Sequence, residues 1–148
     1  MSSNLSIEAS NQINECAETS PYPSMLIDLQ ASMTTEEKIG QMSQFFSHGE
    51  YISEHLAESI RQGRVGSVLN EVRLHTVNEL QRLAVEESRL GIPLLVGRDV
   101  IHGFNTIFPI HLGQSASWVS ETVKNCSQFI AREASTAEVN WTLALMLD

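Results

Sequence analysis

The chain has 148 residues, of which 9 are Lys or Arg and 18 are Asp or Glu, so its formal net charge is −9. This acidic balance argues against a nucleic-acid partner, and 42% hydrophobic residues with 18% charged residues are typical of one packed domain. No stretch is apolar enough to span a membrane and no secretory signal is visible, so we expect a cytoplasmic chain, while a periplasmic or secreted longer parent stays open.

The cysteines and short motifs predict neither a metal site nor a cofactor. Cys16 and Cys126 lie far apart, without a CxxC pair or a histidine at ligand spacing, and we interpret both as free thiols. The sequence also lacks the glycine motifs that bind dinucleotides or phosphates and the zincin motif.

Residues 1–24 have the composition of a poorly ordered leader. They contain several Glu, Ser and Asn but no Lys or Arg, and Pro21-Tyr22-Pro23 stands just before the composition becomes more apolar. We therefore predict one structured region, residues 25–148.

The first helix of that region is predicted to begin near Thr34. Thr34 can cap it, and Glu37, three residues later, can reach back to Thr34. Its apolar positions recur at three to four residues and would share one face: Ile39, Met42 and Phe45 or Phe46. Gly49 is available to end this helix.

A second helix shows the same signals. Thr76 and Glu79 form another capping pair, and Gly91 followed by Pro93 gives a stop signal. The apolar positions between them are Leu80, Leu83, Ala84 and Leu90.

A third helix is predicted to open at Ser120-Glu121, with Asn140 near its end. Its apolar positions are Val123, Cys126, Phe129, Ile130 and Ala134.

Three short apolar runs lie between or after these helices, at residues 65–70, 93–99 and 139–148. The first two lack clean alternation of apolar and polar residues, which is typical of strands covered on both faces. Because helices separate the runs, the sequence predicts an α/β fold with βαβ units and a parallel sheet.

The three runs end in polar side chains: Asn70, Asp99 and Asp148. Parallel strands place such residues at the carboxyl edge of the sheet, where α/β folds bind ligands. Since neighbouring strands lie about 4.8 Å apart, Asp99 and Asp148 could approach the roughly 5 to 5.5 Å that separates the carboxyl groups of retaining glycosidases. The alternative is that each Asp caps a turn or the following helix.

The histidines and tryptophans leave alternatives open. His102 lies three residues after Asp99 and either shares its site or orients it through a hydrogen bond, of which we favour the second. His111 adds a metal-ligand type without a recognisable ligand spacing, so no metal is expected. Trp118 and Trp141 are core residues or sugar-stacking platforms, and core is the commoner role.

Three segments together resemble a known family. MTTEEKIGQ at residues 33–41, IRQGRVGSVLN at 60–70 and LQRLAVEESRLGIPLLVGRDVIHGFNTIF at 80–108 are similar to the opening helix, the first strand and the most distinctive early block of glycoside hydrolase family 3, of the β-glucosidase type. The resemblance extends over about residues 25–148.

The resemblance implies the N-terminal portion of a TIM (β/α)8 barrel, incomplete, with about three βα units. It also implies retaining hydrolysis of a β-glucoside or oligosaccharide by two carboxyl groups. Within the family's Gly-x-Asp-x-x-His-Gly string, Asp99 would bind sugar hydroxyls together with His102, and neither would attack the anomeric carbon.

The family's nucleophile and acid/base lie beyond the matched positions, so we expect the chain alone to be inactive. Alternatives are a subunit completed by a second chain and a non-catalytic sugar-binding or interaction module. Asn105, His111 and Val119 stand where the family commonly has a basic residue, Pro and Asp, and the 141–148 run has drifted as well. Unpaired strand edges also predict poor stability or self-association.

Overall fold

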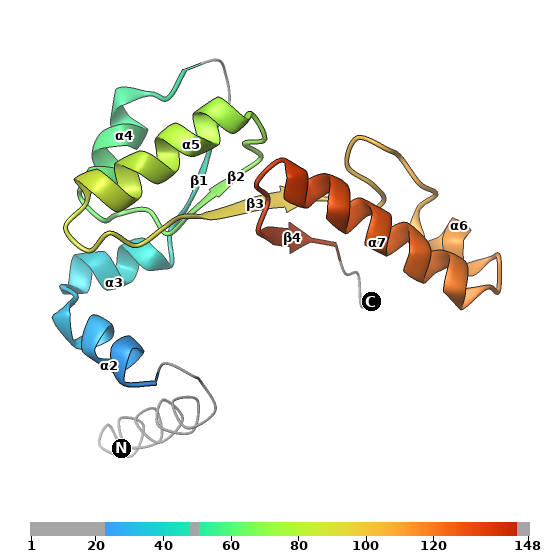
Figure 1. Cartoon of the computed structure of the whole chain (residues 1–148), viewed down its shortest axis with the longest axis horizontal. Helices are drawn as coiled ribbons and strands as arrows, with labels where there is room; N and C mark the ends of the chain where they lie inside the picture. Colours follow the sequence, from blue (N-terminus) through green and yellow to red (C-terminus); the bar gives the residue numbers. More distant parts are fainter. Residues whose placement is uncertain (1–22, 48–50, 145–148) are drawn as a thin grey trace. The chain divides into compact units, whose positions relative to one another are not determined.

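The computed structural model describes residues 23–47 and 51–144 (Figure 1). The chain divides into two units, residues 1–38 and 39–148, which are described separately below. Within the described ranges, every helix is too short or too polar to cross a membrane. Nearly all of the predicted leader lies outside these ranges, so its boundary at residue 24 stays a prediction.

In the first unit, α2 (Pro23–Ser32) precedes the start of α3 (Thr35–Gln41). The predicted capping pair is confirmed. The backbone N–H of Thr34 donates to Oε2 of Glu37 at 2.8 Å, and the backbone N–H of Glu37 donates to Oγ1 of Thr34 at 3.2 Å. Two donors of the first turn are thus satisfied by side chains.

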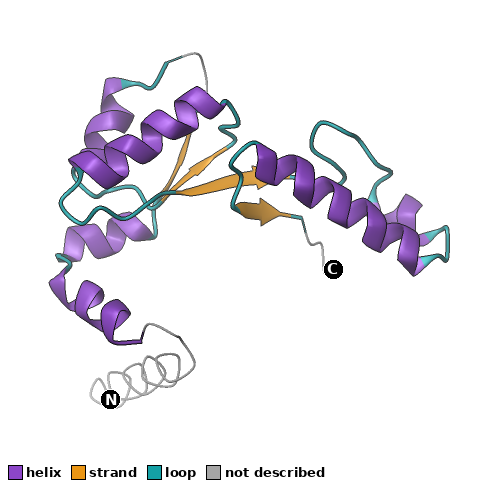
Figure 2. Cartoon of the chain, viewed as in Figure 1, coloured by secondary structure: helices purple, strands orange, loops and turns teal. Residues whose placement is uncertain are grey.

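The second unit is built on a parallel sheet (Figure 2). Four strands lie side by side in chain order: β1 (Gln44–Phe46), β2 (Ser67–Leu69), β3 (Leu95–Asp99) and β4 (Trp141–Leu143). All three neighbouring pairs are parallel. The α/β fold class and the parallel arrangement are confirmed, and the described residues hold one strand more than predicted.

The additional strand, β1, corrects the prediction for the first helix. That helix ends at Gln41, and Phe45 and Phe46 belong to β1 instead of to its apolar face. A Cβ on Gly40 would lie only 2.0 Å from the carbonyl oxygen of Gly63, so α3 ends directly against the turn before β2. The short apolar run at Phe45 and Phe46 fits a helix pattern or a strand pattern equally well, and its pairing with β2 makes it a strand. Gly49 lies outside the described residues.

The helix α4 (Glu54–Arg61) was not predicted from the sequence. Its N-cap is Ser53, whose Oγ accepts the backbone N–H of Leu56 at 3.2 Å. Leu56, Ala57 and Ile60 are buried and give it one apolar face. Both signals are visible in the sequence, although the helix that carries them has only 8 residues.

The second predicted helix is present, but its start is corrected. It comprises α5 (Leu74–Arg82) and a π-helical turn, η1 (Leu83–Glu87). Thr76 is buried inside α5 and caps nothing at its start, while Glu79 pairs with Arg82. Its end is corrected as well: η1 ends at Glu87 with Ser88 as its C-cap, so Leu90 lies outside the helix, and Gly91, with a φ of +61°, belongs to the turn that follows.

The helix α7 (Ser120–Thr136) begins at the predicted residue and follows the short α6 (His111–Ser115). Of its predicted apolar positions, Ile130 and Ala134 are buried. Phe129 remains 46% exposed, so the apolar face of α7 is only partly covered.

Two groups of buried residues hold the second unit together. The first core gathers residues of α4, α5, η1, β2 and β3 and of the segments just before β2 and β3: Leu56, Ala57, Ile60, Val65, Val68, Val77, Leu80, Leu83, Ala84, Leu94 and Val96. The second core lies between β3 and α7 and consists of Val100, Ile130, Ala134 and Val139. Figure 1 shows α4 and α5 beside β1 and β2, and α7 beside β3 and β4.

The opposite face of the sheet carries its own row of side chains. Register aligns Phe46, Leu69, Gly97 and Trp141 across the four strands. Phe46 is 64% exposed and Trp141 39%, so this face has little cover. The exposure of Trp141 gives no support to its predicted role as a core residue. The same prediction is wrong for Trp118, which lies between α6 and α7 and is 94% exposed.

Candidate functional site

The carboxyl edge of the sheet is the candidate site, since the strands are parallel and end there together. Asn70 follows β2 and Asp99 ends β3, as predicted. Asp148 lies outside the described residues, so the predicted approach of Asp99 and Asp148 stays a prediction.

Asp99 is an exposed carboxylate on the less covered face of the sheet. It occupies the same face as Gly97, two residues earlier, and is in register with Leu143 of β4. Its Oδ1 accepts the backbone N–H of Ile101 at 3.1 Å, the one hydrogen bond recorded for this carboxylate among the described residues. The turn-capping alternative thus holds in part, and it leaves acceptor capacity on the carboxylate for a ligand.

His102 lies in the loop that follows β3 and is exposed. Its carbonyl oxygen accepts the backbone N–H of Phe108 at 2.7 Å, which closes the loop. No hydrogen bond joins its side chain to Asp99 in the described part of the chain. The orienting role therefore gains no support from this geometry.

Helix α7 holds the same loop from outside. Both the backbone N–H and the hydroxyl of Thr106 donate to the carboxylate of Glu133, at 2.9 and 2.7 Å. These bonds lower the pKa of Glu133 below its usual value. The ring of Phe108 also meets that of Phe129 edge-on, with centroids 5.9 Å apart.

An ion pair between a buried carboxylate and a half-buried guanidinium fixes the segment after β2. The carboxylate of Glu71 is 1% exposed and accepts two hydrogen bonds from the guanidinium of Arg73, at 2.9 and 2.7 Å. It also accepts the hydroxyl of Ser47 at 2.9 Å and the backbone N–H groups of Val72 and Arg73. Burial alone would raise the pKa of Glu71, but the bonds from Arg73 and Ser47 lower it from 4.5 to about 2.

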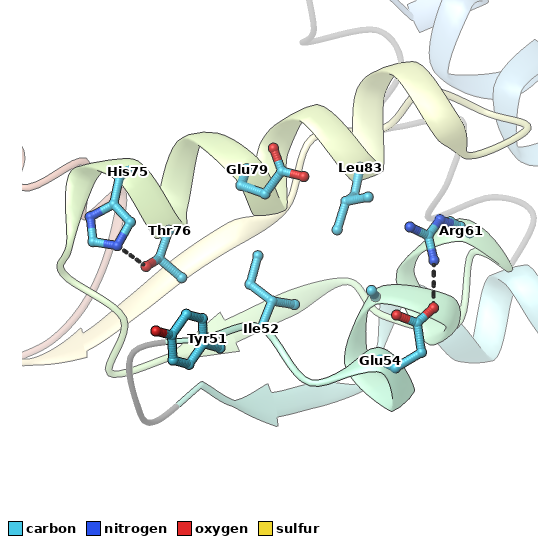
Figure 3. Close-up of a pocket in the computed structure, with 9 residues that line it drawn as sticks. Tyr51, Ile52, Glu54, Arg61, His75, Thr76, Glu79 and Leu83 are labelled. Carbon is cyan, nitrogen blue, oxygen red and sulfur yellow. Dashed lines mark hydrogen bonds and ion pairs between the residues drawn. The ribbon is translucent and has the colours of Figure 1, made fainter.

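Two hollows occur near these elements. The larger, about 340 Å³, lies between α4 and α5 and is lined by residues such as Ile52, Arg61 and Glu79 (Figure 3). Asp99 and His102 do not line it, so we do not assign it to the carboxyl edge. A second hollow, of about 310 Å³, is lined by Ile101, Thr142, Leu143 and Ala144, and thus adjoins the Asp99 turn.

The described residues contain no group of three or more His, Cys, Asp or Glu that could hold a metal ion. His111 is the first residue of α6 and belongs to no such group. Cys126 is a free thiol, as predicted, whereas Cys16 lies outside the described ranges.

Sequence reasoning missed several side chains that shape the edge. Glu71 and Arg73 were not considered, although a charged pair two residues apart directly after a buried strand was a visible signal. The contact between Thr106 and Glu133 joins residues 27 positions apart and had no local signal. No local pattern marks Arg98, whose guanidinium reaches Asn70.

A parallel α/β sheet with an acidic carboxyl edge defines the class of the protein, and comparisons with known proteins define its family. Residues 34–148 match the model of the glycosyl hydrolase family 3 N terminal domain. The chain therefore belongs to this family, and the four strands of its described residues form part of the barrel of that domain.

Relatives in the family are β-glucosidases. The chain is 36% identical over 121 residues to a periplasmic beta-glucosidase of Salmonella typhimurium, which covers 82% of this chain but only 16% of the relative. It is 25% identical to the lysosomal beta glucosidase of Dictyostelium discoideum, covering 81% and 18%. The β-glucosidase of Listeria innocua, solved in complex with glucose, superposes with a TM-score of 0.73 and 30% identity, over 84% of this chain and 19% of the other.

Proposed function

We propose that this chain supplies part of the sugar-binding edge of a retaining β-glucosidase. The observation that carries this proposal is the position of Asp99, an exposed carboxylate at the carboxyl end of β3 on the face that a closed barrel would enclose. Membership in a family of β-glucosidases and the sugar complexes of solved relatives support it.

Asp99 suits a binding role chemically. An ionised carboxylate only accepts hydrogen bonds, and its two oxygens match two adjacent hydroxyls of a pyranose. The turn to the backbone N–H of Ile101 occupies one oxygen and fixes the direction of the side chain. We assign His102 a neighbouring role as a hydrogen-bond donor to the sugar, because both residues are exposed and stand on the same turn.

Hydrolysis with retention needs two further groups, a nucleophilic carboxylate and an acid/base. Among the described residues at the carboxyl edge, Asp99 is the exposed carboxylate, while Glu71 is buried and paired with Arg73. We therefore propose that both groups come from polypeptide outside the described residues, with a second chain as one source. The exposed row at Phe46 and Trp141 favours an additional layer on that sheet face.

Binding is the first test, with D-glucose titrated into the full chain and followed by NMR. We expect binding to the native chain and a loss of at least about tenfold in Asp99→Asn, since a hydrogen bond to a charged group contributes about 1.5 to 3 kcal/mol. Asp28→Asn is the matched control, because Asp28 is exposed on α2, in the other unit. Absence of binding in the native chain would overturn the proposal.

Hydrolysis is the second test, with p-nitrophenyl β-glucoside as substrate. We expect no release of nitrophenol by the chain alone. We expect release when residues 25–148 replace the matched segment of the Salmonella relative, and loss of that release when the replaced segment carries Asp99→Ala. Hydrolysis by the chain alone that disappears in Asp99→Ala and Asp148→Ala would instead make these two carboxyl groups the catalytic pair.

The compartment is a separate proposal. We propose the cytoplasm for the chain as written, although one relative is named periplasmic. Recovery of the expressed chain in a periplasmic fraction would overturn this assignment.

A further inference from the structure

Arg98 connects two segments of the carboxyl edge. Its Nη1 donates to Oδ1 of Asn70 at 3.1 Å, and its guanidinium carbon lies 5.9 Å from the centre of the Phe104 ring. Asn70 directly follows β2, and Phe104 stands in the loop after β3 and packs against the second core. A single side chain therefore joins the end of one strand to the loop that leaves the next.

The contact to Asn70 is reinforced by the backbone. Asn70 has a φ of 68°, a conformation that is uncommon outside glycine and more accessible to Asn than to most residues. Its backbone N–H donates to the carbonyl oxygen of Gly97 at 2.9 Å. Asn70 is thus bonded to β3 through both its backbone and its side chain.

Arg98 cannot reach a ligand on the face of Asp99. Successive strand residues point to opposite faces, so Arg98 shares the helix-covered face with Val96 of the first core. Its Nε is buried and has no hydrogen-bond partner among the described residues, which costs free energy. The contacts to Asn70 and Phe104 are those that offset this cost.

We propose that Arg98 is a positioning residue for Asp99. By tying Asn70 to the loop after β3, it holds the end of β3 in the turn that bonds Asp99 to the backbone N–H of Ile101. The carboxylate is then already oriented when a sugar arrives, which lowers the ordering cost of binding. This inference rests on the proposed function only where it concerns sugar affinity.

The test compares Arg98→Met and Arg98→Lys in the full chain. The readouts are the amide hydrogen exchange of Ile101, the glucose dissociation constant and the thermal midpoint. In Arg98→Met we expect roughly tenfold faster exchange at Ile101 and weaker glucose binding by a similar factor. In Arg98→Lys we expect most of the exchange protection at Ile101 and most of the glucose affinity to be retained, because an ammonium group still donates to Asn70 and still lies over Phe104.

Arg132→Met is the matched control, since Arg132 is exposed on α7. Unchanged Ile101 exchange in Arg98→Met, or an equal increase in Arg132→Met, would overturn the positioning role. A native chain that does not bind glucose would overturn the proposed function instead, and the exchange at Ile101 would still decide the role of Arg98.

Discussion

The two cores of the second unit differ in how completely they bury their apolar side chains. The first core holds eleven buried residues between α4, α5 and the sheet, whereas the second holds four. Around the second core, large apolar side chains remain exposed: Ile107, Ile110, Leu112, Trp118, Val119 and Phe129. The first core thus buries more apolar side chains than the region around α6 and α7 does.

Because of this difference, most of the apolar burial that stabilises the unit lies away from the α7 side of the candidate site. The turn at Asp99 and the loop with His102 connect the two cores, and the loop is held against α7 by a few polar contacts. Regions with few buried apolar contacts open more readily than dense ones. We expect the candidate edge to be ordered on the β2 side and to open most easily on the α7 side.

Leu80→Ala gives the largest expected effect, because Leu80 is 1% exposed in the first core. Removing a buried Leu side chain costs about 2 to 5 kcal/mol in the free energy of unfolding, through lost burial and the cavity that remains. Leu112→Ala makes the same change at a 77% exposed side chain and should cost under about 0.5 kcal/mol. Urea unfolding followed by circular dichroism measures both, and similar losses would contradict the contrast between the cores.

Glu71 gives the next largest effect, through the dependence of stability on pH. Its pKa is about 2 in the folded chain and near 4.5 when unfolded, so the unfolded chain binds the proton more tightly. The contribution of the carboxylate, about 3 kcal/mol, is therefore fully present above pH 4.5 and is lost as the pH falls toward 2.

Glu71→Gln should remove most of this pH dependence and lower the free energy of unfolding at pH 7. Glu121→Gln is the matched control, because Glu121 is exposed and forms only a 3.6 Å contact with Lys124. The measurement is urea unfolding at pH 7, 5 and 3. An unchanged slope in Glu71→Gln would show that other carboxylates carry the acid sensitivity.

The parts of the fold that follow from local periodicity could be predicted. The apolar face of α5 and the start of α7 at Ser120 rest on residues close in sequence. The parallel pairing of β2 with β3 joins distant residues and was expected from the alternation of apolar runs with helices. The predicted start of the second helix failed because α5 begins two residues earlier, at Leu74, and its N-cap residue Arg73 makes no side-chain cap hydrogen bond. The capping pair at Thr76 and Glu79 was a plausible local pattern, but Thr76 is buried inside the helix and Glu79 pairs with Arg82.

The candidate site was only half accessible from sequence. Asp99 could be placed at a strand end by pattern, and its role by resemblance. The contacts of Arg98 to Asn70 and of Thr106 to Glu133 join residues 28 and 27 positions apart. The periodic patterns of helices and strands do not predict contacts between residues so far apart in sequence. β1 was missed for a related reason, because three residues carry too little pattern and the strand depends on pairing with β2.

Trp118 provides a smaller test, on the less covered side. It has a φ of 56° and a 94% exposed side chain, so its backbone conformation is strained while its indole ring gains little from burial. Trp118→Gly should raise the free energy of unfolding by about 0.5 to 1 kcal/mol. Trp118→Ala removes the ring but keeps the strain and should not stabilise the chain. Sedimentation should show less self-association in both variants. Equal free energies of unfolding for the two variants would show that the backbone at residue 118 is not strained.

Glu133→Gln should give the smallest effect on the whole chain and a clear local one. The amide still accepts a bond from Thr106 but loses the charge, so amide exchange at Thr106 should rise while the unfolding midpoint stays within error. Because the pKa of Glu133 is lowered in the folded chain, this contact is complete at neutral pH and weakens as acid protonates the carboxylate. Glu121→Gln, on the same helix, should leave Thr106 unchanged. If Glu133→Gln lowered the midpoint as much as Leu80→Ala does, the loop and the first core would unfold as one unit, and the candidate edge would be as stable as the core beside it.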